Sequence, residues 1–306
     1  MNLNDPSDVL RNVYRHNTKP EWGGAVIAWE REGKRGYQFE DGQLRVFTSG
    51  HYHLLDVIDV SRDRVRSLLA IVDRTSPGTA SAAARADGPS LDEQIDQFLQ
   101  SHEGGFAGEK WRTERRRRPA GRPLKRHRDP AIEAAQQELA REKLTRYLEE
   151  GREVDGLRAL VSVLTGTDLV TASQLQQLAA VPSNASRILV AELRELLYGD
   201  GPATVRLARW VKALTQATRR TPVWPMATAP LALVYPREHI CVQRATFAAQ
   251  AVSMAPQLQL GPTPSASHYG RLLAMCERVR DALTERGHPP ADLFDVSDFL
   301  GVSHRP

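Results

Sequence analysis

The chain has 306 residues, 41% of them hydrophobic and 25% charged, and a net charge of +4. This composition is that of a globular protein with a buried core, which excludes a largely disordered chain, and the length favours two domains. The N-terminus lacks the basic and apolar regions of a secretory signal, no apolar run is long enough to span a membrane, and two cysteines are too few for a disulfide framework, so we expect a cytoplasmic protein without membrane contact.

Residues 1–74 are predicted to form a small β domain. The apolar run at 25–29, the hairpin signal Asp41-Gly42 and the alternation of Leu44 and Val46 predict three short antiparallel strands. Because so small a sheet buries little surface unless it curls on itself, we expect a five-stranded SH3-like barrel. The remaining strands are expected at 9–14 and 52–57, followed by a short helix at 62–72.

The stretch YRHNTKPEWGGAVIAWEREGKRGYQFEDGQLRVF, residues 14–47, resembles the small Tudor/SH3-like domains of bacterial DNA-repair helicase tails and of CarD-type transcription factors. The shared pattern falls on His16, Trp22, Gly23, Val26, Phe39 and Gly42, and the sequence departs from it at Gly24-Ala25. The resemblance implies a module that binds a protein surface, often RNA polymerase, or DNA. Trp22 and Phe39 are expected in its core, and a basic loop with Arg31, Lys34 and Arg35 is its predicted contact surface.

Residues 75–90 are rich in Ser, Ala, Gly and Pro without an apolar period, which predicts a flexible linker. Residues 91–306 are predicted to form a mainly α-helical domain, so the fold class is α+β and multidomain. Ser90 and Glu93 predict a capping box at the start of its first helix, and Asp129 is predicted as the N-cap of a helix with Pro130 at its first position. Further helices are expected at 157–164, 172–180, 185–198, 203–217 and 267–286, and an extended excursion at 221–247.

This second domain is similar to an uncharacterised bacterial family. The similarity falls on Gly104-Gly105-Phe106, Leu196-Leu197-Tyr198-Gly199, Trp224-Pro225 with Ala227-Thr228, and the closing DLFDVSDFLGV. It implies no activity, but it does imply that residues 114–118 lie at the end of a helix.

A basic segment at 110–128 is the most unusual feature of the charge distribution. From 111 to 128 the chain has nine Lys or Arg side chains and one acid, Glu114, so the rest of the chain is negative overall. Gly121-Arg122-Pro123 resembles the core of an AT-hook, with Ala120 where a second basic residue is usual. Such a segment either displaces counterions from nucleic-acid phosphates or serves as a solvated connector. The candidate phosphate contacts are Arg112, Arg115, Arg116, Arg117, Arg118, Arg122, Lys125, Arg126 and Arg128.

Three groups of residues have side chains of the kinds found in catalytic or metal sites. His51 and His53 would share one face of a strand, but no third ligand completes a metal site, so we interpret them as a surface pair. The acids Asp292, Asp295 and Asp298 recur every three residues among core positions, which is better explained by helix N-capping and solvation than by a cation site. His239 and Cys241 have no third orienting group, so we expect a packed Cys beside a partly exposed His.

No complete catalytic signature is present, and neither a cofactor nor a metal is predicted. The leading hypothesis is a nucleic-acid-associated, non-enzymatic adaptor or regulator of DNA repair or transcription. Its basic segment would bind DNA phosphates with little sequence selectivity, and its barrel would bind DNA or a protein such as RNA polymerase or a repair factor. One alternative is an enzyme or toxin-like effector whose helical-domain pocket contains Trp224, His239, Arg244 and the acids of 292–298. The other is a pure protein-interaction module.

Overall fold

A computed structural model describes residues 13–31, 34–41, 43–58, 89–117, 123–256 and 258–304. The chain divides into two compact units, residues 1–87 and 88–306. The helix expected at 62–72 and nearly all of the linker expected at 75–90 lie outside the described residues. Within the described ranges, no helix is both long and apolar enough to cross a membrane.

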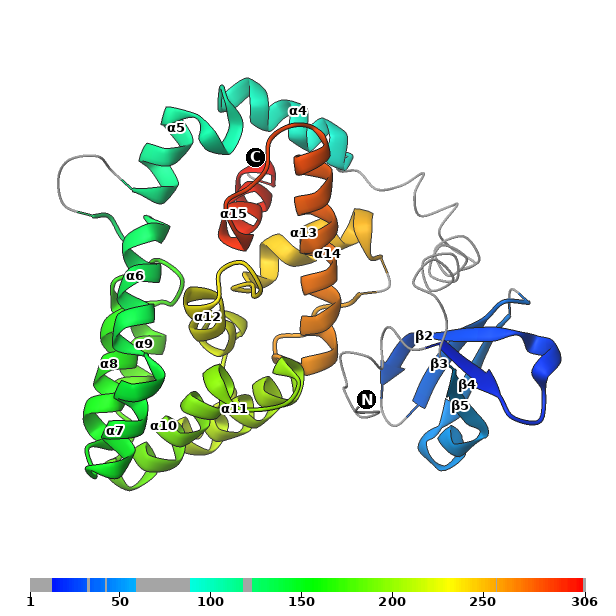
Figure 1. Ribbon diagram of the computed structural model, residues 1–306, viewed down its shortest axis with the longest axis horizontal. Helices are drawn as coiled ribbons and strands as arrows, with labels where there is room; N and C mark the ends of the chain where they lie inside the picture. Colours follow the sequence, from blue (N-terminus) through cyan, green and yellow to red (C-terminus); the bar gives the residue numbers. More distant parts are fainter. Residues whose placement is uncertain are drawn as a thin grey trace. The chain divides into compact units, whose positions relative to one another are not determined.

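The first unit contains a five-stranded antiparallel sheet (Figure 1). Its strands are β1 (Val13–His16), β2 (Gly24–Arg31), β3 (Lys34–Phe39), β4 (Leu44–Thr48) and β5 (Leu55–Ile58). Their order is β4-β3-β2-β1-β5, which leaves β4 and β5 at the two edges. The sheet is therefore open in the part of the chain that the structure describes, without the pairing of β4 to β5 that would close a barrel.

The three strands expected from the apolar patterns at 25–29, 37–39 and 44–46 are confirmed as β2, β3 and β4. Phe39 N donates to the carbonyl of Gln43 at 3.0 Å, which closes the turn between β3 and β4. The expected strand at 52–57 begins later, because residues Ser49–Leu54 form the 3₁₀ helix η2. Most of the strand expected at 9–14 lies before the first described residue, Val13.

One face of this sheet forms a small aromatic core. Phe39 is fully buried, as predicted, and Trp22 packs edge-on against it with ring centroids 5.3 Å apart. Tyr37 packs edge-on against Tyr14 at 5.2 Å. The alternation of side chains along a strand places these rings on a single face. The cluster consists of Tyr14, Ala25, Ile27, Tyr37, Phe39 and Leu55, with Trp22 and Phe47 packed against it.

The second unit is helical. Its elements are α4 (Leu91–Ser101), η4 (Gly105–Ala107), α5 (Glu109–Trp111), the π-helical turn η5 (Arg112–Arg116), α6 (Arg128–Glu138), α7 (Arg141–Glu149), α8 (Glu153–Thr165), α9 (Ala172–Ala179), α10 (Ser183–Tyr198), α11 (Ala203–Thr218), α12 (Trp224–Val234), α13 (Arg244–Met254), α14 (Ala266–Glu285) and α15 (Leu293–Ser303). The helices expected at 157–164, 172–180, 185–198, 203–217 and 267–286 are confirmed as α8, α9, α10, α11 and α14.

Helix ends were predicted correctly at one position and wrongly at another. The capping box before α4 is formed in both directions: Glu93 N donates to Ser90 Oγ at 3.3 Å, and Ser90 N donates to Glu93 Oε2 at 2.7 Å. The N-cap of α6 is His127 instead of Asp129. Asp129 is the second residue of the helix, and its carboxylate pairs with Arg116 at 2.8 Å.

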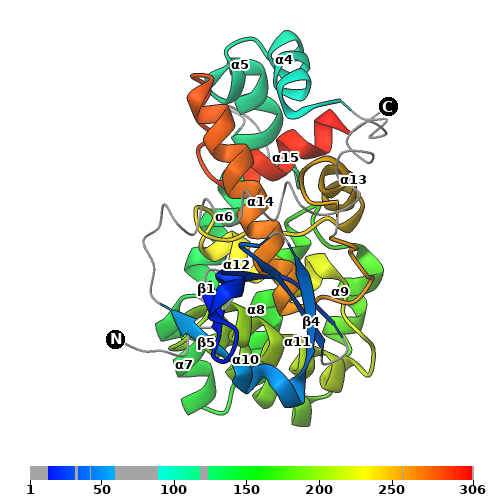
Figure 2. The same cartoon turned by 90° about the vertical axis from the view of Figure 1, so that its right-hand side faces the viewer.

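The prediction of an extended excursion at 221–247 is wrong. Residues Trp224–Val234 form helix α12, which lies at the centre of the helical unit (Figures 1 and 2) and packs against α6, α10 and α11. Pro225 occupies the first turn, where a missing N–H has no consequence, and Pro230 lies inside the helix. Because the helix is buried on every side, it is apolar all round and has no helical period to detect.

Candidate functional site

The basic segment is part of the folded helical unit. Arg112, Arg115 and Arg116 belong to the turn η5, and Arg128 begins α6. Arg118 and Arg122, together with most of the motif that resembles an AT-hook, lie outside the described residues. The nine predicted cations therefore occupy different environments, and each described one can be considered in turn.

Arg116 is surrounded by carboxylates. Its guanidinium donates to both oxygens of Asp292, at 3.0 and 2.8 Å, and it lies 2.8 Å from Asp129 and 3.5 Å from Asp295. The side chain is only 14% exposed. Burial alone would lower the pKa of this guanidinium, but the surrounding aspartates raise it above its ordinary value, so Arg116 is always charged. Its positive charge is therefore neutralised by carboxylates within the protein.

Arg128 forms a second cluster of the same kind. Its Nε and Nη2 donate to the two oxygens of Asp298, at 2.8 and 2.7 Å, and its Nη1 donates to Asp168 at 2.6 Å. The guanidinium also lies over the ring of Phe294, 5.4 Å from its centroid. Burial opposes this charge, yet the two carboxylates raise the pKa of Arg128 above its ordinary value. Two acids therefore more than neutralise this arginine.

The three acids of α15 hold the basic segment in place. Asp292 is the N-cap of α15 and accepts from the amides of Phe294 and Asp295, at 2.9 and 3.2 Å, which confirms the predicted capping role. The expectation that these acids are solvated is wrong, because Asp292 and Asp295 are buried. Their spacing of three residues faces them toward η5 and the start of α6. We call the set Arg115, Arg116, Arg128, Asp129, Asp168, Asp292, Asp295 and Asp298 the arginine–aspartate network.

Asp295 is the most buried acid of the network, with 1% of its side chain exposed. One of its oxygens accepts from the indole Nε1 of Trp111, and the other from the amide of Ala291, both at 2.8 Å. Burial raises the pKa of the Asp295 carboxyl to about 6, although Arg116 and Trp111 act in the opposite direction. Trp111 is itself fully buried, so this hydrogen bond joins α5 to the start of α15.

The remaining described cations of the segment face solvent. Arg112 and Lys125 are exposed and form no ion pair with a described residue. Arg126 is also exposed, and its Nε donates to the carbonyl of Glu114 at 3.1 Å, which places it against η5. Arg117 is exposed and pairs with Glu133 on α6. Of the nine predicted contacts, these four are exposed among the described residues; Lys110, at the start of the segment, is exposed as well.

The cations predicted in the first unit do not form a loop. Arg31 ends β2 and pairs in register with Lys34, which begins β3. Lys34 is exposed, whereas Arg35 is half-buried with its guanidinium 4.2 Å from the centroid of the Tyr52 ring. Because Lys34 and Arg35 are neighbours on one strand, their side chains leave opposite faces of the sheet.

The histidines and the cysteine that were considered as metal ligands or catalytic groups lie in ordinary structural positions. His51 and His53 are in the 3₁₀ helix η2 instead of a strand, exposed and with rings 6.5 Å apart, which agrees with a surface pair. In the ranges that the structure describes, no group of three or more His, Cys, Asp or Glu side chains could hold a metal ion. Cys241 is buried as expected, but His239 is also buried, and its Nδ1 lies 3.1 Å from the hydroxyl of Tyr269.

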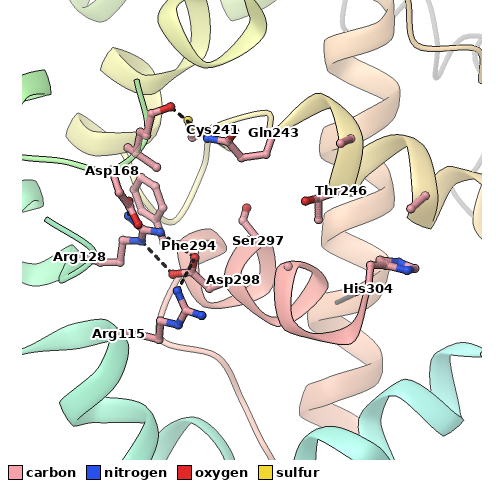
Figure 3. A pocket seen from close by; sticks show the side chains of 14 residues that line it. Arg115, Arg128, Asp168, Cys241, Gln243, Thr246, Phe294, Ser297, Asp298 and His304 are labelled. Atoms are coloured by element: carbon pink, nitrogen blue, oxygen red, sulfur yellow. Dashed lines mark hydrogen bonds and ion pairs between the residues drawn. The ribbon is translucent and has the colours of Figure 1, made fainter. Parts of the chain in front are cut away.

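The arginine–aspartate network borders a hollow of about 400 Å³ between α13 and α15 (Figure 3). Arg115 and Arg128 converge on Asp298 at one end of it, and Thr246 and Ser297 point into the space between the two helices. Under the alternative hypothesis of an enzyme, Trp224, His239 and Arg244 would line a pocket, but they do not line this one. Its walls are formed by Arg115, Arg128, Asp168, Leu169, Cys241, Gln243, Ala245, Thr246, Ala249, Phe294, Ser297, Asp298, Gly301 and His304.

Small residues create this hollow, and the sequence analysis did not single them out. Ala245 and Ala249 on α13 are four residues apart, as are Ser297 and Gly301 on α15. Residues four apart share a helix face, so a face of small side chains on α13 lies opposite a face of small side chains on α15. The recurrence of small side chains at this spacing is the sequence pattern that could have indicated a hollow. The pattern predicts a hollow only when it is known that these two helices pack against each other. A second hollow, of about 490 Å³, is lined in part by Arg116, Glu133 and Tyr235.

Comparison with known protein families, with curated proteins and with solved structures finds no match to this chain.

Proposed function

We propose that this protein is a nucleic-acid-associated, non-enzymatic adaptor, with phosphate contacts made by Arg112, Arg117, Lys125 and Arg126. The observation that carries the proposal is the division of the basic segment into two classes of side chain. Arg116 and Arg128 are hydrogen-bonded to internal aspartates and Arg115 lies largely buried 3.9 Å from Asp298, while these four cations remain exposed. The internal network anchors the segment, and the four exposed cations face solvent, where phosphates can reach them.

The number of exposed cations sets the expected strength of binding. Each phosphate neutralised by a Lys or Arg releases counterions, with a slope of log K against log salt of about −0.9 per contact on duplex DNA. Nine contacts would give a slope of about −8, and the four exposed cations found among the described residues account for about −3 to −4. Arg117 contributes less if it keeps its pairing with Glu133. We therefore expect weak, salt-sensitive binding with little sequence selectivity.

The first unit is proposed to be an SH3/Tudor-like module that binds DNA or a protein such as RNA polymerase or a repair factor. Its strand order, with β1 between β2 and β5, and the 3₁₀ helix between β4 and β5 support this assignment. On the edge strand β4, Leu44 and Val46 are 43% and 52% exposed. A strand that has no partner on one side among the described residues, and that carries exposed apolar side chains, is suited to a protein partner.

The proposal is tested by fluorescence anisotropy with a labelled A·T-rich duplex and a labelled single strand, across a series of salt concentrations. The test variant of the full chain changes Arg112, Arg117, Lys125 and Arg126 to Gln. The control variant changes four other exposed cations of the helical unit, Arg146, Lys212, Arg220 and Arg237, to Gln. Both variants lose the same charge, so net charge alone cannot distinguish them.

We expect the test variant to lose about three units of the salt slope and the control variant to keep the slope of the wild type. Equal losses in both variants would mean that binding follows net charge and that the basic segment has no special role. Absence of binding by the wild type at moderate salt would refute the proposal.

A further inference from the structure

Arg115 has a buried hydrogen-bond donor for which the described residues supply no acceptor. Its side chain is 12% exposed, and its Nε is buried without a hydrogen-bond partner. The nearest carboxylate, Asp298, is 3.9 Å away and already accepts from Arg128 with both oxygens. A guanidinium has five N–H donors, and leaving them unsatisfied in a buried place is unfavourable. Among the described residues, one donor of Arg115, the buried Nε, therefore has no acceptor, and the side chain lines the hollow between α13 and α15.

The opposite wall of this hollow also favours negative charge. Helix α13 begins at Arg244, and its N-cap, Gln243, makes no capping hydrogen bond with its side chain. The first amides of a helix have no partner within the helix, and the helix dipole makes this end positive. Ala245 and Thr246, in this first turn, line the hollow.

The charges that border the hollow sum to zero. Arg128 is paired with both Asp168 and Asp298, and Arg115 supplies the second positive charge. His304 adds none at neutral pH, because burial lowers its pKa below the ordinary value. The favourable places for an anion are thus local, at the guanidinium of Arg115 and the start of α13. Because Asp298 lies 3.9 Å from Arg115, each additional negative charge on a ligand adds repulsion, which favours a monoanion over a phosphate dianion.

The rest of the hollow is suited to a small organic molecule. Phe294 and Leu169 provide apolar contact, and the hydroxyl of Ser297 donates to the carbonyl of Leu293 at 2.8 Å, which leaves its oxygen able to accept. A methyl group added at Gly301 would meet no atom within 4 Å. We propose that this hollow binds a small organic monocarboxylate, with the guanidinium of Arg115 as the partner of the carboxylate.

This site is separate from the proposed nucleic-acid contact, because Arg115 is not one of the exposed cations. The test follows the Nε–Hε signals of arginine side chains by NMR in the full chain, labelled with ¹⁵N-arginine. Benzoate and, separately, lactate are titrated at constant ionic strength. Benzyl alcohol, which has the ring without the carboxylate, and inorganic phosphate serve as comparison probes. The Arg115 signal is assigned by its loss in Arg115→Gln.

Three variants sharpen the test. Arg115→Gln removes the guanidinium, and Gly301→Leu fills the hollow without touching Arg115; the replacement of an interior helix glycine also favours folding. Arg112→Gln is the matched control, since it removes an exposed arginine of the same turn. Thermal unfolding verifies that all three variants are folded.

We expect at least one carboxylate to shift the Arg115 signal saturably, and benzyl alcohol to leave it in place. In Arg115→Gln and Gly301→Leu, the affinity measured from ligand signals should fall at least about tenfold, while Arg112→Gln binds as the wild type does. The proposal is overturned if neither carboxylate gives a saturable shift, if phosphate alone does, or if benzyl alcohol binds equally well. Unchanged affinity in Arg115→Gln would also overturn it.

Discussion

The guanidinium of Arg116 donates two hydrogen bonds to the carboxylate of Asp292, a residue 176 positions later in the chain. A second pair, Arg128 and Asp298, is 170 positions apart in the chain. Together the two pairs connect the basic segment to helix α15 and its N-cap. A two-pronged pairing of this kind fixes both distance and orientation. The segment that looks most like a free cationic arm is therefore partly an internal clamp.

Replacement of Arg116 by Ala is expected to destabilise the protein by about 3 kcal/mol, because Asp292 and Asp295 would stay buried without their cation. Arg112→Ala, which removes an exposed arginine of the same turn, should change stability by less than about 0.5 kcal/mol. Urea unfolding of both variants measures the difference. Similar midpoints for the two variants would show that the clamp contributes little.

The hydrogen bond between Trp111 and Asp295 can be removed without removing the aromatic ring. Trp111→Phe should destabilise the protein by about 1–3 kcal/mol, through the lost packing and the lost donor to a buried carboxylate. Because that donor helps to hold the carboxylate charged, the pKa of Asp295 should rise further in the variant. Carboxyl NMR titration of Asp295 in both proteins measures it; an unchanged pKa would contradict the assigned role of Trp111.

Burial of Asp295 gives a defined pH dependence. Its pKa is raised from 3.8 to about 6, so between these values the folded state binds a proton that the unfolded state does not. The contribution of Asp295 to the free energy of unfolding therefore falls as the pH rises from about 4 to about 6, by an amount on the order of 3 kcal/mol. Stability measured over this range against Asp295→Asn isolates the effect, and a constant difference between the two proteins would be inconsistent with it.

His239 should give a dependence of opposite sign. Burial, aided by the charge of Arg206, lowers its pKa from 6.5 to about 4, so in this window the unfolded state binds the extra proton. Its contribution to stability is complete above pH 6.5 and is lost as the pH falls toward 4, by about 3 kcal/mol at most. The comparison protein is His239→Asn, which retains a polar partner for Tyr269. The wild type alone would not reveal either effect, because Asp295 and His239 oppose each other.

Local signals were sufficient for much of the fold. The capping box of Ser90 and Glu93, the N-cap Asp292 and the apolar periods of α8, α10 and α14 each depend on residues within a turn or two of one another. They were predicted correctly because the physics that forms them is equally local. Helix α12 was missed for the converse reason: a helix buried on all sides has no polar face to create a period.

In the candidate site, too, the local patterns could be predicted from the sequence and the contacts between distant residues could not. The sequence by itself determined that cations gather at 110–128 and that three aspartates recur at 292–298, since both are patterns of neighbouring residues. Only the tertiary structure decided which charges meet. Arg116 and Arg128 are withdrawn from solvent by α15, Arg112 and Lys125 are left exposed, and Arg115 is directed into a hollow that small residues of α13 and α15 keep open. Charge pairing depends on distance in space, and the fold brings together residues that no sequence pattern relates.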